Sequence, residues 1–451
     1  MTKKEKKEIA INTKLLSIVD RYLVDLECLR EMHSSVVPFL QEKDKERKEI
    51  VSQVLDKAMV EESKDTDIEA KEQEEHKNDD EPSKKTVSLK LSGAEVEVLM
   101  SNMGKIRRAE ELFEKQVAVT LVSRFDEFLS GFLSLVLEQN PSWLISSEKT
   151  ITYKELIDLK SIDKAIEGVI QKEVENLLRG SHEDQISYID EKLKLGISDN
   201  FEKLSEFLEV AERRNLFVHT GGVVSQQYLD KCNGFGCKIK DSKQGDCLCS
   251  DSDYFNDAFF IYFEIGLRIG QAAYRRLFPN EFEVADRSLN RSAIKFMNAG
   301  EYNLAEIITE FDLAIPDKLR SKDTEYLYFA RINRAFAQKF SGKDFEKGLE
   351  GVPWNVFHPK YALCLHVLRD EFVEAAKLMQ SDEIKSSVGQ EGFRTWPVFR
   401  EFREKEEFRN VYKELYGDDY IPDLEKDTEL KVEQESKALS EQSYRDRDAH
   451  R

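Results

Sequence analysis

The stretch VAVTLVSRFDEFLSGFLSLVLEQN, residues 117–140, limits what this chain can fold into more than any other part of it. It is long and largely apolar, and it ends at Pro141. Four large apolar side chains recur in it at helical spacing and would share one side of a helix: Phe125, Phe128, Leu129 and Phe132. The stretch therefore predicts a core helix in a helical domain.

Few residues elsewhere would interrupt helices. The 451 residues include nine prolines and twenty glycines, and 35% are charged, which suits a helix-rich protein of two or three domains. We therefore predict an all-α fold. No stretch approaches the about 20 uncharged apolar residues that cross a bilayer. The start, MTKKEKKEIA, lacks the apolar segment of a secretory signal. These features predict a cytoplasmic protein with no membrane partner.

Composition and periodicity divide the chain into five parts. An apolar seam and a turn near SSVVPF predict an N-terminal helical hairpin. A disordered linker follows, in which residues 61 to 81 hold eleven acids against three lysines. A helical domain comes next, with helices expected near 153–160, 162–179, 183–195 and 199–219 and a loop or hairpin at 223–250. Helix pairs and a polar tail complete the chain. The expected bounds are 1–60, 61–85, 86–280, 286–416 and 417–451.

Three segments in the region 286–416 share a pattern of small and aromatic residues. A turn at Ala299-Gly300 precedes Tyr302 and Ala305, and the pattern returns as Gly342 with Phe345 and as Phe372 with Ala375. This pattern resembles the tetratricopeptide repeat, although its period is irregular. Stacked helix pairs create an extended concave face, so the resemblance implies a surface for a protein or ligand that triggers the protein.

The sequence EVAERRNLFVHTGG, residues 209–222, brings polar residues close to the end of a predicted helix. Glycines at 221 and 222 stop that helix. Since each helical residue turns by about 100°, Glu212, Asn215 and His219 share a stripe about 60° wide, and Arg214 lies towards its border. Such a set can supply a general acid–base and a phosphate clamp. It also fits a solvated helix end, where a histidine favours the negative pole of the helix dipole.

RNA cleavage is a reaction that such a set could perform without a metal. The 2′-hydroxyl is an internal nucleophile, so the protein must move protons and stabilise a negatively charged phosphorane. One group must take the 2′-hydroxyl proton while another protonates the leaving 5′-oxygen. A two-fold dimer would bring two histidines and two arginines into one cleft.

The run from Arg214 to His219 resembles the R-[polar]-x3-H signature of HEPN domains, the higher eukaryote and prokaryote nucleotide-binding family. The surroundings are similar too: LVSRFDEFLSGFL, NPSWL, LLRGSHEDQ and GGVVSQQYL. The resemblance covers roughly residues 110–275. It implies a helical bundle that is a homodimer or a higher homo-oligomer, and a metal-independent endoribonuclease that needs no cofactor. It further implies a toxin or antiviral defence role in bacteria.

On that resemblance His219 is the acid–base, Arg214 the phosphate contact and Asn215 the orienting polar residue. Glu212 is added from its helical position alone. Some HEPN proteins have lost activity and serve as binding modules, so a non-catalytic dimerising scaffold that recruits partners through the repeats is the alternative. His182 could approach the cleft, but Ser181 and Asp184 favour a helix cap there.

Any RNA contact would have to be local, because the net charge of −20 opposes non-specific adhesion to RNA. Arg213, Arg275 and Arg276 are candidates for such contacts. Four cysteines cluster with the spacing C-x4-C-x9-C-x-C and could hold a structural zinc: Cys232, Cys237, Cys247 and Cys249. Incidental reduced thiols in a glycine-rich loop fit the same spacing.

Overall fold

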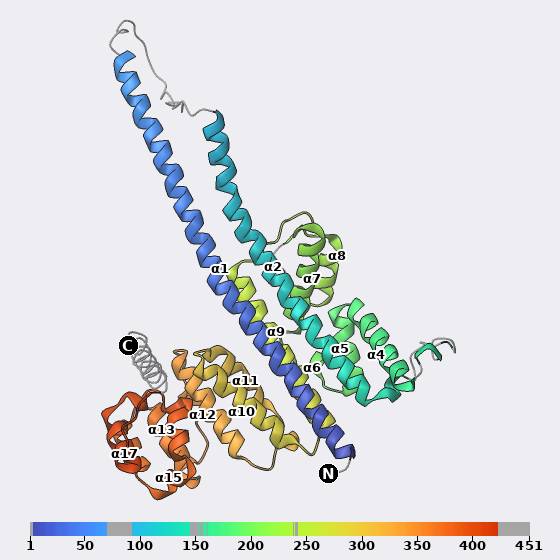
Figure 1. Ribbon diagram of the computed structural model, residues 1–451, viewed down its shortest axis with the longest axis vertical. Helices are drawn as coiled ribbons and strands as arrows, with labels where there is room; N and C mark the ends of the chain where they lie inside the picture. Colours follow the sequence, from blue (N-terminus) through green and yellow to red (C-terminus); the bar gives the residue numbers. More distant parts are fainter. Residues whose placement is uncertain are drawn as a thin grey trace, which may run out of the picture. The chain divides into compact units, whose positions relative to one another are not determined.

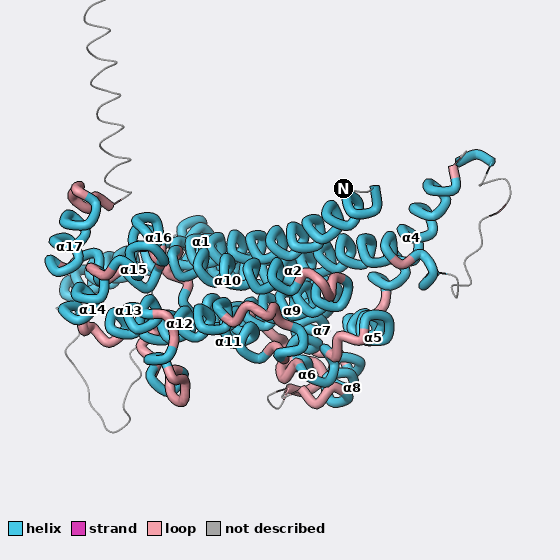
Figure 2. The backbone as a smooth tube through the Cα atoms, turned by 90° about the horizontal axis from the view of Figure 1, so that it is seen from below, coloured by secondary structure: helices cyan, strands magenta, loops and turns pink. Residues whose placement is uncertain are grey.

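The protein is α-helical throughout the part described by the computed structural model (Figures 1 and 2). The described residues are 3–69, 93–144, 152, 157–159, 161–237, 239 and 242–422. Within these ranges the only β-type pairing is an isolated bridge between Val223 and Cys247. The prediction of an all-α fold is therefore confirmed. The chain forms two compact units, Met1–Leu277 and Phe278–Arg451.

Three long helices form the body of the first unit. The helices α1 (Lys3–Glu69), α2 (Gly93–Gln139) and α9 (Ser252–Leu277) pack against one another, with α9 alongside the N-terminal part of α1 (Figure 1). The four side chains predicted to form the core face of α2 are all buried: Phe125, Phe128, Leu129 and Phe132. Shorter helices pack on this body: α4 (Ile162–Arg179), α5 (His182–Leu193), α6 (Ile197–Asn200), α7 (Leu204–Thr220) and α8 (Gln226–Gly234).

The expected N-terminal hairpin is wrong, because α1 continues through Pro38. A proline inside a helix removes one backbone hydrogen bond. Packing offsets that loss: Val37 is buried just before the proline, and Gln41 just after it donates a 2.8 Å hydrogen bond to Glu110 on α2. The N-terminal segment is thus part of the first unit. Residues 61–69 of the expected linker belong to α1, and residues 70–85 lie outside the described residues.

Glycines let α1 approach α9 closely. Tyr22 of α1 lies against Gly266, and Val19 lies against Gly270; a Cβ at either glycine would overlap the facing side chain. Tyr22 also donates a 2.8 Å hydrogen bond to the carbonyl of Tyr262 on α9. This contact fixes the register of the two helices.

The second unit begins with the helices α10 (Phe282–Asn298), α11 (Tyr302–Ala314) and α12 (Glu325–Phe340). The turn expected at Ala299-Gly300 joins α10 to α11, with Gly300 in the left-handed region at φ +79°. Five shorter helices follow: α13 (Pro359–Leu368), α14 (Phe372–Met379), α15 (Asp382–Ser387), α16 (Gly389–Thr395) and α17 (Glu406–Tyr416).

The segment around Gly342 does not form a helix pair. After α12 the chain passes through two 3-10 turns, Glu346–Gly348 and Trp354–Val356. Glycines at 348 and 351 and a proline at 353 interrupt this segment, which opposes a second helix. The tail beyond residue 422 lies outside the described residues. None of the helices in the described ranges has the length and apolar character of a membrane span.

Candidate functional site

Two glycines end the helix α7, which carries the Arg214–His219 run. Gly221 caps it in the left-handed region at φ +66°. Gly222 has φ +102°, and a Cβ there would lie 2.6 Å from the Leu248 carbonyl oxygen. The chain then pairs briefly with residues 245–248, since Leu248 N donates to Gly222 O at 2.9 Å. Residues 223–250 were expected to be a loop or hairpin, but they also contain α8, whose N-terminus is capped by Ser225.

Arg214 is fixed by a carboxylate of α2. Its Nη2 lies 2.6 Å from Asp126 Oδ2, and its Nη1 donates to Asn215 Oδ1 at 3.2 Å. The other Asp126 oxygen lies 3.1 Å from His182 Nε2 of α5. Three helices therefore meet at one carboxylate, with a guanidinium and an imidazole on its two oxygens. The side chains of Arg214, Asp126 and His182 are 23%, 29% and 11% exposed, so the cluster is largely buried but still accessible to solvent.

His219, the last residue of the Arg214–His219 run, lies apart from this cluster. His219 is exposed in the last turn of α7 and has no hydrogen bond or ion pair with any described residue. Lys115 of α2 donates a 2.8 Å hydrogen bond to the Gly221 carbonyl, which adds a cation to the same helix end. A single chain thus brings Arg214 and Asn215 together, while His219 is presented to solvent.

Glu212 does not join the Arg214 cluster. Its Oε1 lies 2.5 Å from Lys231 Nζ of α8, and its side chain is 11% exposed. Helical geometry alone would place Glu212, Asn215 and His219 on one stripe of an isolated helix. Here α8 covers the part of the stripe that holds Glu212 and leaves His219 uncovered.

The three arginines expected to touch RNA have different surroundings. Arg213 pairs with Glu209 at 2.7 Å and lies 4.0 Å over the ring of Tyr254, within the first unit. Arg275 is buried, whereas Arg276 is exposed at the end of α9. The burial of Arg275 opposes the expectation that it contacts RNA. The ion pair of Arg213 does not test that expectation, and Arg276 is exposed.

The four clustered cysteines do not converge on a zinc site. Cys232 is buried in α8 against Leu216 and Tyr228, and burial raises the pKa of its thiol to about 12. Burial also raises the pKa of Cys237 to about 11, whereas Cys247 and Cys249 are exposed. In the described part of the chain, no three His, Cys, Asp or Glu side chains are grouped to hold a metal ion. The arrangement favours the alternative of incidental reduced thiols, because Cys232 packs as a core residue.

Two residues of the cluster were not assigned to the site from the sequence. Asp126 was missed, although an acid between Phe125 and Phe128 in an apolar stretch is a signal for a paired, partly buried charge. His182 was expected to be a capping neighbour. Its segment does form the capping box of Ser181 and Asp184, and the imidazole itself also reaches Asp126.

Comparison of the chain with protein-family models, with curated proteins and with solved structures finds no match. The chemistry of the site therefore rests on its own geometry.

Proposed function

We propose that the protein is a metal-independent endoribonuclease of the HEPN type, with a composite site formed by two copies of α7. The observation that carries the proposal is a fixed arginine and an exposed histidine five positions apart at the end of one helix. Asp126 orients Arg214, so the guanidinium loses little further freedom when it meets a phosphate. His219 is free to exchange protons with a substrate.

In the proposed reaction the 2′-oxygen attacks phosphorus and the bond to the 5′-oxygen breaks, which leaves a 2′,3′-cyclic phosphate. His219 of one copy accepts the 2′-hydroxyl proton, and His219 of the second copy donates a proton to the 5′-oxygen. Arg214 offsets the charge on the non-bridging oxygens, and Asn215 helps to orient it. No step requires a metal ion.

Exposed apolar side chains beside His219 favour a second copy there. Val218 is 53% exposed and Val223 is 43% exposed, on either side of the end of α7. Apolar side chains that flank a catalytic histidine suit an interface that excludes water around it. The proposed setting is a bacterial toxin or antiviral effector controlled through its C-terminal unit.

A non-catalytic scaffold is the second candidate, and one observation favours it. The charges of Arg214 and Glu212 are already balanced within the chain, by Asp126 and Lys231. The motif would then anchor α7 to α2 and α8, and the dimer would recruit partners without cleaving RNA.

Incubation of the purified protein with total RNA and tRNA in EDTA separates the candidates. The ribonuclease predicts cleavage with 2′,3′-cyclic phosphate ends by the wild type and none by His219→Ala. His366→Ala is the matched control, because His366 is a partly exposed histidine near the end of a helix in the other unit. RNA left intact by the wild type, also after addition of cell extract as a source of trigger, contradicts the proposal.

A further inference from the structure

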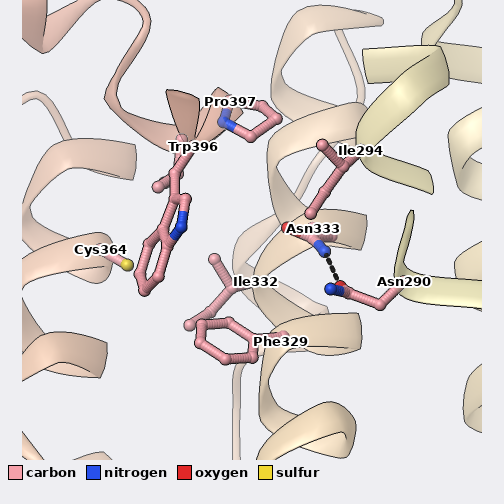
Figure 3. Close-up of a pocket in the computed structure, with 9 residues that line it drawn as sticks. Asn290, Ile294, Phe329, Ile332, Asn333, Cys364, Trp396 and Pro397 are labelled. Carbon is pink, nitrogen blue, oxygen red and sulfur yellow. Dashed lines mark hydrogen bonds between the residues drawn. The ribbon is translucent and has the colours of Figure 1, made fainter. Parts of the chain in front are cut away.

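A pocket in the second unit has one aromatic side and one amide side (Figure 3). It lies between the helices α10, α12 and α13 and the Trp396–Val398 segment that follows α16, and its cavity volume is about 90 Å³. Apolar side chains form most of the lining: Ile294, Phe329, Ile332, Trp396, Pro397 and Val398. This volume is below the usual range for drug-sized ligands, so the pocket suits only a ligand about the size of one small ring system.

Two asparagines supply the polar edge of the pocket. Asn333 Nδ2 donates a 2.8 Å hydrogen bond to Asn290 Oδ1 (Figure 3). The remaining oxygen of Asn333 and the remaining nitrogen of Asn290 have no partner among the described residues. If both amides were turned over, the bond would reverse and again leave one free donor and one free acceptor. The pair therefore always presents one free donor and one free acceptor.

The free amide groups lie in the pocket wall among apolar side chains. Asn333 is 7% exposed and is surrounded by apolar side chains. Both free amide atoms are accessible to solvent, so a ligand with a matching edge would have to replace their hydrogen bonds to water. Trp396 and Phe329 supply ring faces and edges on which a planar ligand can stack or pack.

We propose that this pocket binds a nucleobase, either free or as part of a nucleoside. All four RNA bases are planar and carry a donor next to an acceptor on one edge, which is the complement of the asparagine pair. Stacking on an aromatic side chain tolerates any base, so the amide pair supplies the orientation. The proposal does not rest on ribonuclease activity, because every group involved belongs to the second unit.

The chemistry of the nearby thiol agrees with reversible binding. Cys364 lies in the pocket wall, and burial raises its pKa to about 12. At neutral pH it is a thiol, so it is a poor nucleophile and acts as apolar wall. The pocket is therefore assigned to recognition of the ligand.

Isothermal titration of the full-length protein with adenine, guanine, cytosine and uracil, each up to about 1 mM, tests the proposal. At least one base should bind with one-to-one stoichiometry. Asn290→Ala should weaken that binding about tenfold, because it removes one hydrogen bond and frees its partner. Asn290 is half-buried on α10, so this change leaves the fold intact; Asn303→Ala, an exposed asparagine on α11, is the matched control and should bind as the wild type does.

Two further arms complete the experiment. Titration with the matching nucleoside shows whether the site accepts a base that carries a ribose. An affinity similar to that of the free base means that the ribose projects out of the pocket mouth. Loss of binding restricts the site to free bases. Toluene serves as an apolar probe without a polar edge. The proposal is overturned if no base binds to the wild type, if Asn290→Ala binds as the wild type does, or if toluene binds as tightly as the best base.

Discussion

Replacement of Gly266 by alanine tests the contact that fixes α1 against α9. An added Cβ would lie 2.8 Å from Tyr22 Cδ1 and closer still to Cε1. The ring cannot move aside easily, because it stacks on Phe128 at 4.6 Å and its hydroxyl donates to the Tyr262 carbonyl. Overpacking costs about 1–3 kcal/mol, and loss of the buried hydroxyl's partner costs about 1–3 kcal/mol more. The higher helix propensity of alanine returns about 1 kcal/mol.

The expected net loss in the free energy of unfolding is about 3 kcal/mol, within a range of about 1–5. Urea unfolding of the first unit measures it through Trp143, in a background where Trp354 and Trp396 of the other unit are replaced by phenylalanine. Gly168→Ala on α4 is the control: nothing lies within 4 Å of the added Cβ, so it should stabilise by about 0.5–1 kcal/mol. A Gly266→Ala protein as stable as the wild type would refute the reasoning.

Three further predictions concern the site and its surroundings. Asp126→Asn should lower RNA cleavage about tenfold or more, because Arg214 loses its charged partner, while Glu127→Gln, an exposed neighbour, should not. Iodoacetamide at pH 8 should alkylate exposed Cys247 quickly and spare buried Cys232, whose pKa is raised to about 12, as peptide mass mapping would show. Burial lowers the pKa of His33, so as the pH falls this histidine is protonated in the unfolded state before it is protonated in the folded state. The free energy of unfolding should therefore decrease as the pH drops below about 6.5. Urea titrations should show a smaller decrease for His33→Gln.

Local signals were sufficient to predict the buried face of α2 and the C-terminal ends of α2 and α7. The spacing of Phe125, Phe128 and Phe132 defines the buried face of α2, and Pro141 follows its end. Likewise, the glycines at 221 and 222 end α7 as expected. Both kinds of signal act within one or two helical turns, so they can be recognised without knowledge of tertiary contacts.

Long-range packing decided the features that were wrong or missed. Arg214 and Asp126 are 88 residues apart, and the sequence near either residue does not identify its partner. Pro38 was read as a turn, but burial of the α1 seam outweighs the lost hydrogen bond. Cys232 was a candidate metal ligand because its spacing to other cysteines is visible in the sequence, whereas its place in a core is not.

The contact between α1 and α9 also sets an order of events during synthesis. Tyr22 and Tyr262 are separated by 240 residues. At about 5–20 residues per second, α1 leaves the ribosome roughly 12–48 s before its partner exists. Throughout that interval the face of α1 that carries Val19 and Tyr22 lacks α9, whereas α2, which is made earlier, can already pack against α1. The pair of α1 and α2 can therefore form first, and α9 completes the core of the first unit when it leaves the ribosome.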